Sequence, residues 1–339
     1  MSGISLKLKE RKNLRIFYHF YKLYIKSFFS SPISVFLGMI IVTFTLFMWL
    51  LFREGDPFIL ASAIGAMVAR VAMQLFHRNL VLQKANGFTT IMNFTPVNPL
   101  LRMSASIVAN LTICLGMGFV MIMATIAIFP EQREIVAGVN WTMFLSAVFL
   151  LWFLVILMAI TIDMFFKNAM KGMILIITMY IFVYNLLGCA YPYQIIANYS
   201  WLNIMLYTFP PRYMMNVMQA GWVNAKNLVY NDPEFSVDWK LKGNLALPYI
   251  VTFACIILLL TILIMVIIIK AKYHKKDGYG SSVILKLSTK YIRDIKRSTS
   301  FEEIQNLRKE HLEKLGYRFD DEIEVKASIK KKKIKKGRK

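Results

Sequence analysis

Long apolar runs recur along the chain and indicate its class. Each is roughly 20 residues long, enough for a helix to cross a hydrocarbon core of about 30 Å. A membrane β-barrel would instead alternate apolar and polar residues in segments of about ten. The pattern predicts an all-α polytopic membrane protein with six transmembrane helices, at residues 33–52, 58–74, 104–129, 142–162, 172–191 and 249–269.

The composition agrees with this class, and the placement of charge predicts which way the chain is oriented in the membrane. Charged residues make up 18% of the chain, against about 25% in soluble proteins. The net charge of +22 is concentrated at the two ends, whereas the turns at 53–57 and 130–140 each carry one Arg and two acids. The positive-inside rule therefore predicts a multi-pass protein of the cell membrane with both termini cytoplasmic.

The N-terminal arm, residues 1–32, has a helical pattern before the first apolar run. Its cations share one face and its aromatic residues another, which is typical of an amphipathic helix lying among anionic headgroups. Ser31 and Pro32 then break the pattern. We expect an interfacial elbow helix here, with a disordered basic arm as the alternative. The cationic face is Arg15, His19, Lys22 and Lys26, and the aromatic face is Phe17, Phe20, Tyr21, Tyr24 and Phe28.

The polar segment 78–102, between the second and third runs, is longer than a turn requires. An amphipathic pattern runs from Leu80 to Met92. A proline then forces the residue before it out of the helical region. These features predict a short cytoplasmic helix followed by a fixed corner, on which another protein could act. The residues expected to matter are Gly87, Phe94, Thr95, Pro96 and Val97.

A few polar side chains lie in or beside the predicted spans. Arg70 is close enough to the cytoplasmic end to snorkel, which favours structural pairing over a role in substrate binding or gating. Asp163 precedes Lys167 by four residues, the spacing of a helical ion pair, which is favoured over a proton relay. Asn110 and Asn185 are expected to tie helices together.

The outer segment 192–248 contains a semi-apolar run, 195–209, that is too short and polar to span. A second amphipathic piece ends near Val223. We expect two short helices dipping into the outer leaflet, then a polar extracellular loop over 231–244. A re-entrant pair requires that its backbone be buried in protein. The prolines and their neighbours at the turn are Pro210, Pro211, Arg212 and Tyr213.

The tail, residues 271–339, is predicted to be a basic cytoplasmic segment. Ser300 and Glu303 form a capping box, which begins a helix that Gly316 ends. Residues 330–339 are almost all cationic. In a membrane protein this favours anionic lipid or solvation over nucleic acid.

The sequence lacks three common motifs of nucleotide binding and hydrolysis. It has no G-x-x-x-x-G-K-[ST] phosphate loop, no H-E-x-x-H and no G-x-S-x-G. The three cysteines fall inside predicted spans, and the four histidines lack the spacing of metal ligands. We therefore expect no enzyme, no metal and no cofactor in this chain.

The order of elements resembles the membrane permease of type-two ABC exporters, over about residues 10–270. The matching features are Ser31 and Pro32 before the first span, Gly87 and the Thr95–Val97 corner in the first cytoplasmic loop, and Pro192 with residues 210–213 outside. Two features depart from the family. Gln83 and Lys84 stand where an acidic residue is common, and the tail is longer than usual.

The resemblance implies a half-transporter. Two permease chains, identical or paralogous, would dimerise around a central pathway, and each would receive a separate cytoplasmic P-loop ATPase that binds ATP and Mg. The elbow helix and the 78–102 loop would dock on that ATPase. The cargo class it implies is amphipathic, drug-like, lipid-like or polysaccharide.

Two other classes stay open. A stand-alone secondary carrier or channel would have internal repeats and mid-membrane carboxylates, which the sequence lacks. A structural anchor that acts through its tail would need neither the 78–102 loop nor the outer segment.

Overall fold

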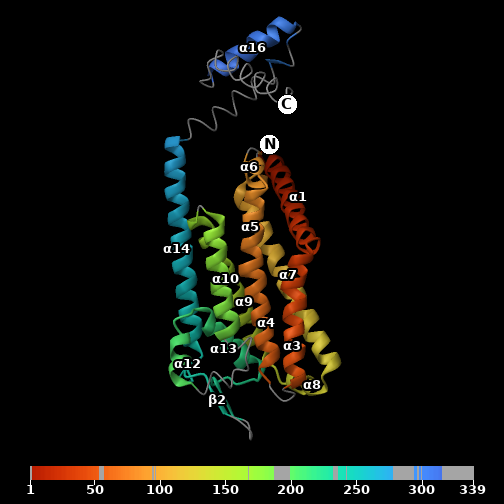
Figure 1. The fold of residues 1–339 in the computed structure, drawn as a ribbon, viewed down its shortest axis with the longest axis vertical. Helices are drawn as coiled ribbons and strands as arrows, with labels where there is room; N and C mark the ends of the chain where they lie inside the picture. The colour runs from red at the N-terminus through yellow and green to blue at the C-terminus, as the bar shows by residue number, and fades with distance from the viewer. Residues whose placement is uncertain are drawn as a thin grey trace, which may run out of the picture. The chain divides into compact units, whose positions relative to one another are not determined.

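The computed structural model describes residues 2–52, 57–93, 95, 97–166, 168–186, 199–231, 236–241, 243–277, 294–295, 298 and 300–314. Its contacts divide the chain into two units, Met1–Val266 and Ile267–Lys339. In the first unit, helices run alongside one another over most of its length (Figure 1). In the second, α16 (Phe301–Lys314) begins as predicted, with the amide of Glu302 donating to Ser300 Oγ over 3.2 Å.

Five helices in the described residues are long and apolar enough to cross a membrane, so an all-α polytopic membrane protein is supported. The predicted span at 172–191 corresponds to α10 (Ala169–Leu186), a shorter apolar helix, and the predicted end of that span lies outside the described residues. Six spans therefore remain a prediction. The five helices are Pro32–Phe52, Ile59–Ala85, Pro99–Ile128 (α7), Trp141–Phe165 (α9) and Ala246–Ile269, the last within α14 (Ala246–Asp277).

The first two spans each contain a π-helical turn. The first consists of α2 (Pro32–Val35), η1 (Phe36–Ile40) and α3 (Ile41–Phe52). The second consists of α4 (Ile59–Ala69), η2 (Arg70–Leu75) and α5 (Phe76–Ala85). The two π turns pack on each other beside Gly38. A Cβ at Gly38 would lie 3.0 Å from the Leu75 side chain and 3.3 Å from that of Phe28, so a glycine is needed for this close approach.

The second span is longer than the sequence analysis predicts. Its helix passes residue 74 without a break and ends only at Ala85, and α7 begins at Pro99 instead of Ser104. The end of an apolar run marks the end of the hydrocarbon layer, whereas a helix continues until its backbone is interrupted. The interruption comes at Gly87, whose φ of 70° ends the helix. The connecting segment is therefore shorter than 78–102.

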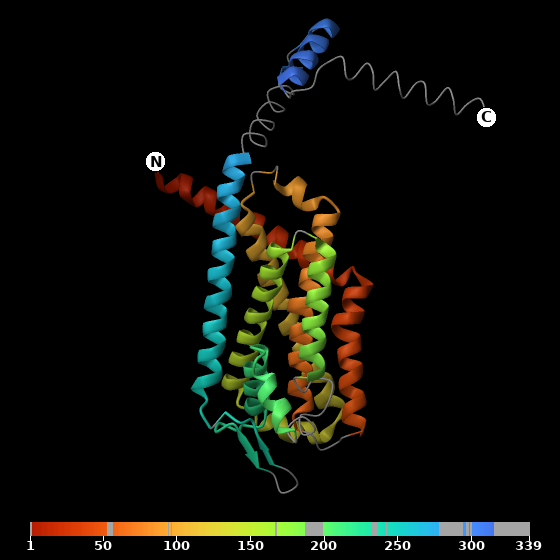
Figure 2. The ribbon, with the colours of Figure 1, turned by 60° about the vertical axis from the view of Figure 1, so that its left-hand side comes forward.

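The predicted elbow corresponds to α1 (Ser2–Phe29), which begins earlier than the expected amphipathic segment. It ends just before Ser31, which caps α2. α1 packs along α7, with Tyr24 and Phe28 buried (Figures 1 and 2). The aromatic face therefore contacts protein. The exposed face carries the four predicted cations, Arg15, His19, Lys22 and Lys26, and its contact with lipid remains a prediction.

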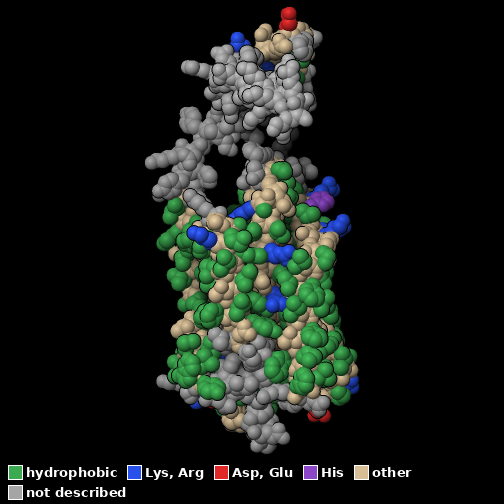
Figure 3. Space-filling model, viewed as in Figure 1, with side chains coloured by type: hydrophobic (Ala, Val, Ile, Leu, Met, Phe, Trp, Pro, Cys, Tyr) green, Lys and Arg blue, Asp and Glu red, His purple; other side chains and the backbone are tan. Residues whose placement is uncertain are grey.

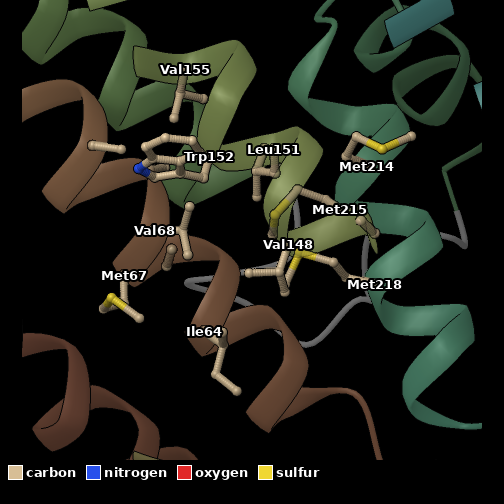
Figure 4. Close-up of a cluster of buried hydrophobic side chains, with 14 of the residues drawn as sticks. Ile64, Met67, Val68, Val148, Leu151, Trp152, Val155, Met214, Met215 and Met218 are labelled. Atoms are coloured by element: carbon tan, nitrogen blue, oxygen red, sulfur yellow. The ribbon is translucent and has the colours of Figure 1, made fainter. Parts of the chain in front are cut away.

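The core lies where α4, α9 and α13 (Pro211–Trp222) meet. Every residue of α4 is buried, which makes it the innermost described helix. Small residues allow the close approach: a Cβ at Gly65 would lie 2.4 Å from Met215 Sδ, and one at Gly221 would lie 2.9 Å from the Phe144 backbone nitrogen. Figure 4 shows side chains of the three helices in one cluster, labelled Ile64, Met67, Val68, Val148, Leu151, Trp152, Val155, Met214, Met215 and Met218.

At the end of the bundle opposite α6, the chain forms two short helices, as predicted, and an unpredicted β-hairpin. The helices are α12 (Ser200–Leu206) and α13, and the strands are β1 (Val229–Asn231) and β2 (Ser236–Asp238), paired antiparallel. Strands of three residues are too short to show a period-two pattern. Another unpredicted helix, α8 (Pro130–Ala137), follows α7.

The hairpin continues into Trp239, which is buried against the bundle. Its indole Nε1 donates to Gln219 Oε1 over 3.2 Å, and Gln219 Nε2 donates to Ser62 Oγ over 2.8 Å. This chain of hydrogen bonds connects the hairpin, α13 and α4. The described residues from α13 to Trp239 are therefore tied to the folded core.

We expect Gly221→Ala to weaken the contact between α13 and α9. The added methyl group meets backbone, so one helix must move, at a cost of about 1–3 kcal/mol. The measurement is the free energy of unfolding of the purified chain in mixed detergent micelles.

Gly116→Ala in α7 is the matched control, because nothing lies within 4 Å of the added atom. Alanine is also the better helix former, so this variant should be unchanged or slightly more stable. Equal effects of the two substitutions would contradict the packing described here.

Candidate functional site

A sharp corner joins α5 to α6 (Phe88–Asn93) at the end of the bundle where α6 lies (Figure 1). The left-handed conformation of Gly87 makes the turn, and its amide donates to the Lys84 carbonyl over 3.1 Å. Thr95 Oγ1 donates to the Met92 carbonyl over 2.7 Å at the far end of α6. We call residues 85–88 the α5–α6 corner. The sequence analysis expects one short helix ending at a corner near Pro96, whereas the structure divides this stretch at Gly87 into the end of α5 and the short helix α6.

The predicted loop residues are only partly described. Gly87, Thr95 and Val97 lie in or next to the corner and α6, whereas Phe94 and Pro96 lie outside the described residues. The segment then enters α7 at Pro99, where the Leu100 amide donates to Asn98 Oδ1 over 2.9 Å. Side-chain caps of this kind satisfy amides that have no partner within the helix.

An ion pair fixes the end of α5 to the end of α9. Lys84 Nζ lies 2.7 Å from both carboxylate oxygens of Asp163 and 3.3 Å from the Asp163 carbonyl oxygen. The Asp163 side chain is only 12% exposed. A cation at this position also opposes the partial negative charge at the C-terminal end of α9. The α5–α6 corner is therefore attached to a second membrane helix.

Sequence reasoning missed this partner. It paired Asp163 with Lys167, which lies outside the described residues. The available signal was topological, because Lys84 and Asp163 both follow apolar runs that end at the same side of the membrane. Which spans are neighbours could not be read from the pattern.

Asn110, at the middle of the bundle, joins four segments. Its Nδ2 donates to the Val71 carbonyl over 3.1 Å and to Tyr24 Oη over 3.5 Å, and its Oδ1 accepts from Trp152 Nε1 over 2.9 Å. α7 is thereby tied to α1, η2 and α9. Burial raises the pKa of the Tyr24 hydroxyl, so the hydroxyl stays protonated. By contrast, the bond that Asn185 makes within the described residues stays in its own helix, where it donates to the Ile181 carbonyl over 3.0 Å.

Arg70 is held by a carbonyl and two aromatic rings. Its Nη1 donates to the Leu37 carbonyl in η1 over 2.8 Å, and its guanidinium carbon lies 4.5 Å from the Tyr180 ring centroid and 5.8 Å from that of Tyr184. This arrangement joins the first span, the second span and α10. Contacts of this kind position helices relative to one another.

The predicted residues of the outer turn lie at the other end of the bundle. Arg212 is fully buried near the start of α13, with its guanidinium carbon 5.5 Å from the Tyr207 ring. The Tyr207 hydroxyl donates to the Trp239 carbonyl and accepts from Asn216 Nδ2 over 2.9 Å. Pro210 and Pro211 begin the helix. This group is separate from the α5–α6 corner.

A cavity of about 460 Å³ lies beside the corner, between α1, α5, α6 and α7. Its lining combines apolar side chains with amides, hydroxyls and the guanidinium of Arg102. The lining contains no Asp or Glu. Within the described residues, no three His, Cys, Asp or Glu side chains gather closely enough to hold a metal ion.

Comparisons with protein-family models, with curated proteins and with solved structures find no match to this chain.

We expect Asn110→Ala to lower the free energy of unfolding by about 2–3 kcal/mol, because the buried Trp152 indole loses its acceptor. The matched control is Asn185→Ala, which breaks only a bond within one helix and should cost less than about 1 kcal/mol. Unfolding in mixed detergent micelles measures both. Equal losses would show that Asn110 does not tie the helices together.

We expect a double-mutant cycle with Lys84→Gln and Asp163→Asn to give a coupling free energy of about 1 kcal/mol, because the carboxylate is largely buried. Lys240 and Asp238, 3.6 Å apart with both side chains about half exposed, provide a control pair. The same cycle there should give a coupling near zero. A coupling at Lys84 and Asp163 no larger than the control would remove the ion pair as a link between α5 and α9.

Proposed function

We propose that this chain is the permease subunit of an ATP-driven exporter of the type-two ABC class, and that a separate ATPase acts on its α5–α6 corner. The observation that carries the proposal is the continuity of the corner with the most buried helix. The second span runs from α4, in which every residue is buried, through η2 to Ala85. A displacement of α6 would therefore reach the centre of the bundle.

The corner has the mechanical properties that such coupling needs. α6 is joined to α5 by a two-residue turn, and Lys84 holds the end of α5 on Asp163. Helices joined by a short fixed turn move as a unit, whereas a long Gly/Ser-rich loop would absorb the motion. The shift would spread from α5 to α9 directly.

The other helices have the following roles in the proposed permease. α10 is the fifth of six spans, and both termini are in the cytoplasm of a cell-membrane protein. α12 and α13 form the re-entrant outer pair, and the burial of α13 in protein supports this. α1 is the elbow helix, with its exposed cations facing anionic headgroups or the ATPase.

The working unit would contain two such permease chains, identical or paralogous. ATP and Mg bind the partner subunit, and this chain performs no hydrolysis of its own. The cargo class is amphipathic, drug-like, lipid-like or polysaccharide.

The experiment is a purification of the tagged full-length chain from its own membranes in mild detergent. Co-purifying proteins are identified and ATP hydrolysis is assayed. We expect a stoichiometric P-loop ATPase. Gly87→Ala should reduce its recovery or its activity several-fold, because a side chain at φ of 70° costs about 1 kcal/mol or more.

Gly116→Ala is the matched control, since it adds the same methyl group to open space in a helix. It should retain the partner. The absence of a co-purifying ATPase from the unmodified chain would overturn the proposal and redirect the search to ion-coupled transport or channel activity. Retention of full activity by Gly87→Ala would remove the corner as the docking point.

A further inference from the structure

Arg102 is a charged side chain without a protein partner at the border of the bundle. It lies in the first turn of α7, three residues after the helix begins at Pro99, and is partly buried. Within the described residues its guanidinium makes no hydrogen bond or ion pair. The apolar segment of α7 begins at the same level, which is the depth at which lipid phosphates lie.

The cavity beside Arg102 has two kinds of wall. Asn79, Gln83 and Asn86 of the α5 segment contribute amides, whereas Leu23 and Leu82 contribute apolar surface. The volume of about 460 Å³ falls in the range of small-molecule sites. Leu23 is 50% exposed and Leu82 is 46% exposed, so the apolar wall is open to the surroundings of the bundle.

The charges near the cavity favour an anion. Its lining holds the Arg102 cation and no carboxylate. Lys22 and Lys26, on the same helix as Leu23, are exposed and do not line the cavity. Guanidinium groups bind phosphate oxygens through paired, charge-assisted hydrogen bonds. Free phosphate would satisfy the guanidinium but would leave the apolar wall uncovered.

We propose that this cavity binds one phospholipid with an anionic headgroup. Arg102 holds the phosphate, the amides of α5 contact the polar headgroup, and the first part of an acyl chain covers Leu23 and Leu82. The bound lipid lies between α1 and the α5–α6 corner and fastens the two together. The proposal depends on membrane insertion alone and not on an ATPase partner.

The test is native mass spectrometry of the full-length chain in detergent, titrated with phosphatidylglycerol or with phosphatidylcholine. The unmodified chain should retain phosphatidylglycerol preferentially. Arg102→Gln should weaken that binding roughly tenfold, the loss expected for a charge-assisted bond. Arg102→Lys should restore part of it. Lys22→Gln, which removes one cation from the exposed face of α1, should change it less than about twofold.

A second variant keeps the test valid if Arg102→Gln fails to fold. Leu82→Glu introduces an opposing charge at a half-exposed position and should weaken phosphatidylglycerol binding while Arg102 is intact. The unfolding midpoint of each variant confirms that it is folded.

Several outcomes would overturn the proposal. Equal affinity for the two lipids would show that the headgroup charge is not recognised. Equal losses in Arg102→Gln and Lys22→Gln would show only diffuse surface charge. Displacement by glycerol phosphate at matching concentration would identify a free-phosphate site. If the chain retains no lipid, the proposal fails, and a protein segment becomes the candidate occupant of the cavity.

Discussion

The hydrocarbon layer supplies no water to backbone carbonyls, and the rest of this fold depends on how the chain meets that constraint at its two π-helical turns. Asn110 donates to the Val71 carbonyl of η2, and Arg70 of η2 donates to the Leu37 carbonyl of η1. In each bond, a side chain from one helix donates to a backbone carbonyl in the π-helical turn of another helix. The polar groups thus fix which helices are neighbours (Figure 1).

The distribution of polarity over the surface follows from the same constraint. Figure 3 shows a face of the bundle covered mostly by hydrophobic side chains, with Lys and Arg gathered towards the end that carries α6. Lys84, at the end of α5, is about half exposed, whereas its partner Asp163 is largely buried. Such a pair contributes about 1 kcal/mol. Its importance lies in its position, since it joins two helices at the point where the chain reverses direction.

The sequence predicted the features that depend on local chemistry. Apolar run length placed the membrane helices, Ser31 with Pro32 separated α1 from the first span, and Ser300 began α16. The π turns, the Lys84–Asp163 pair and the partners of Asn110 could not be predicted, because each depends on which helices pack together. The β-hairpin was missed because strands of three residues are too short to show a period-two pattern.

The methionines between α13 and α4 have a chemical consequence. Thioethers are flexible and fill irregular gaps well. They are also readily oxidised, and a sulfoxide is polar and bulkier. Met215 packs its sulfur close to Gly65, with no room there for a β-carbon. Oxidation of this buried sulfur would therefore disturb the packing between α13 and α4.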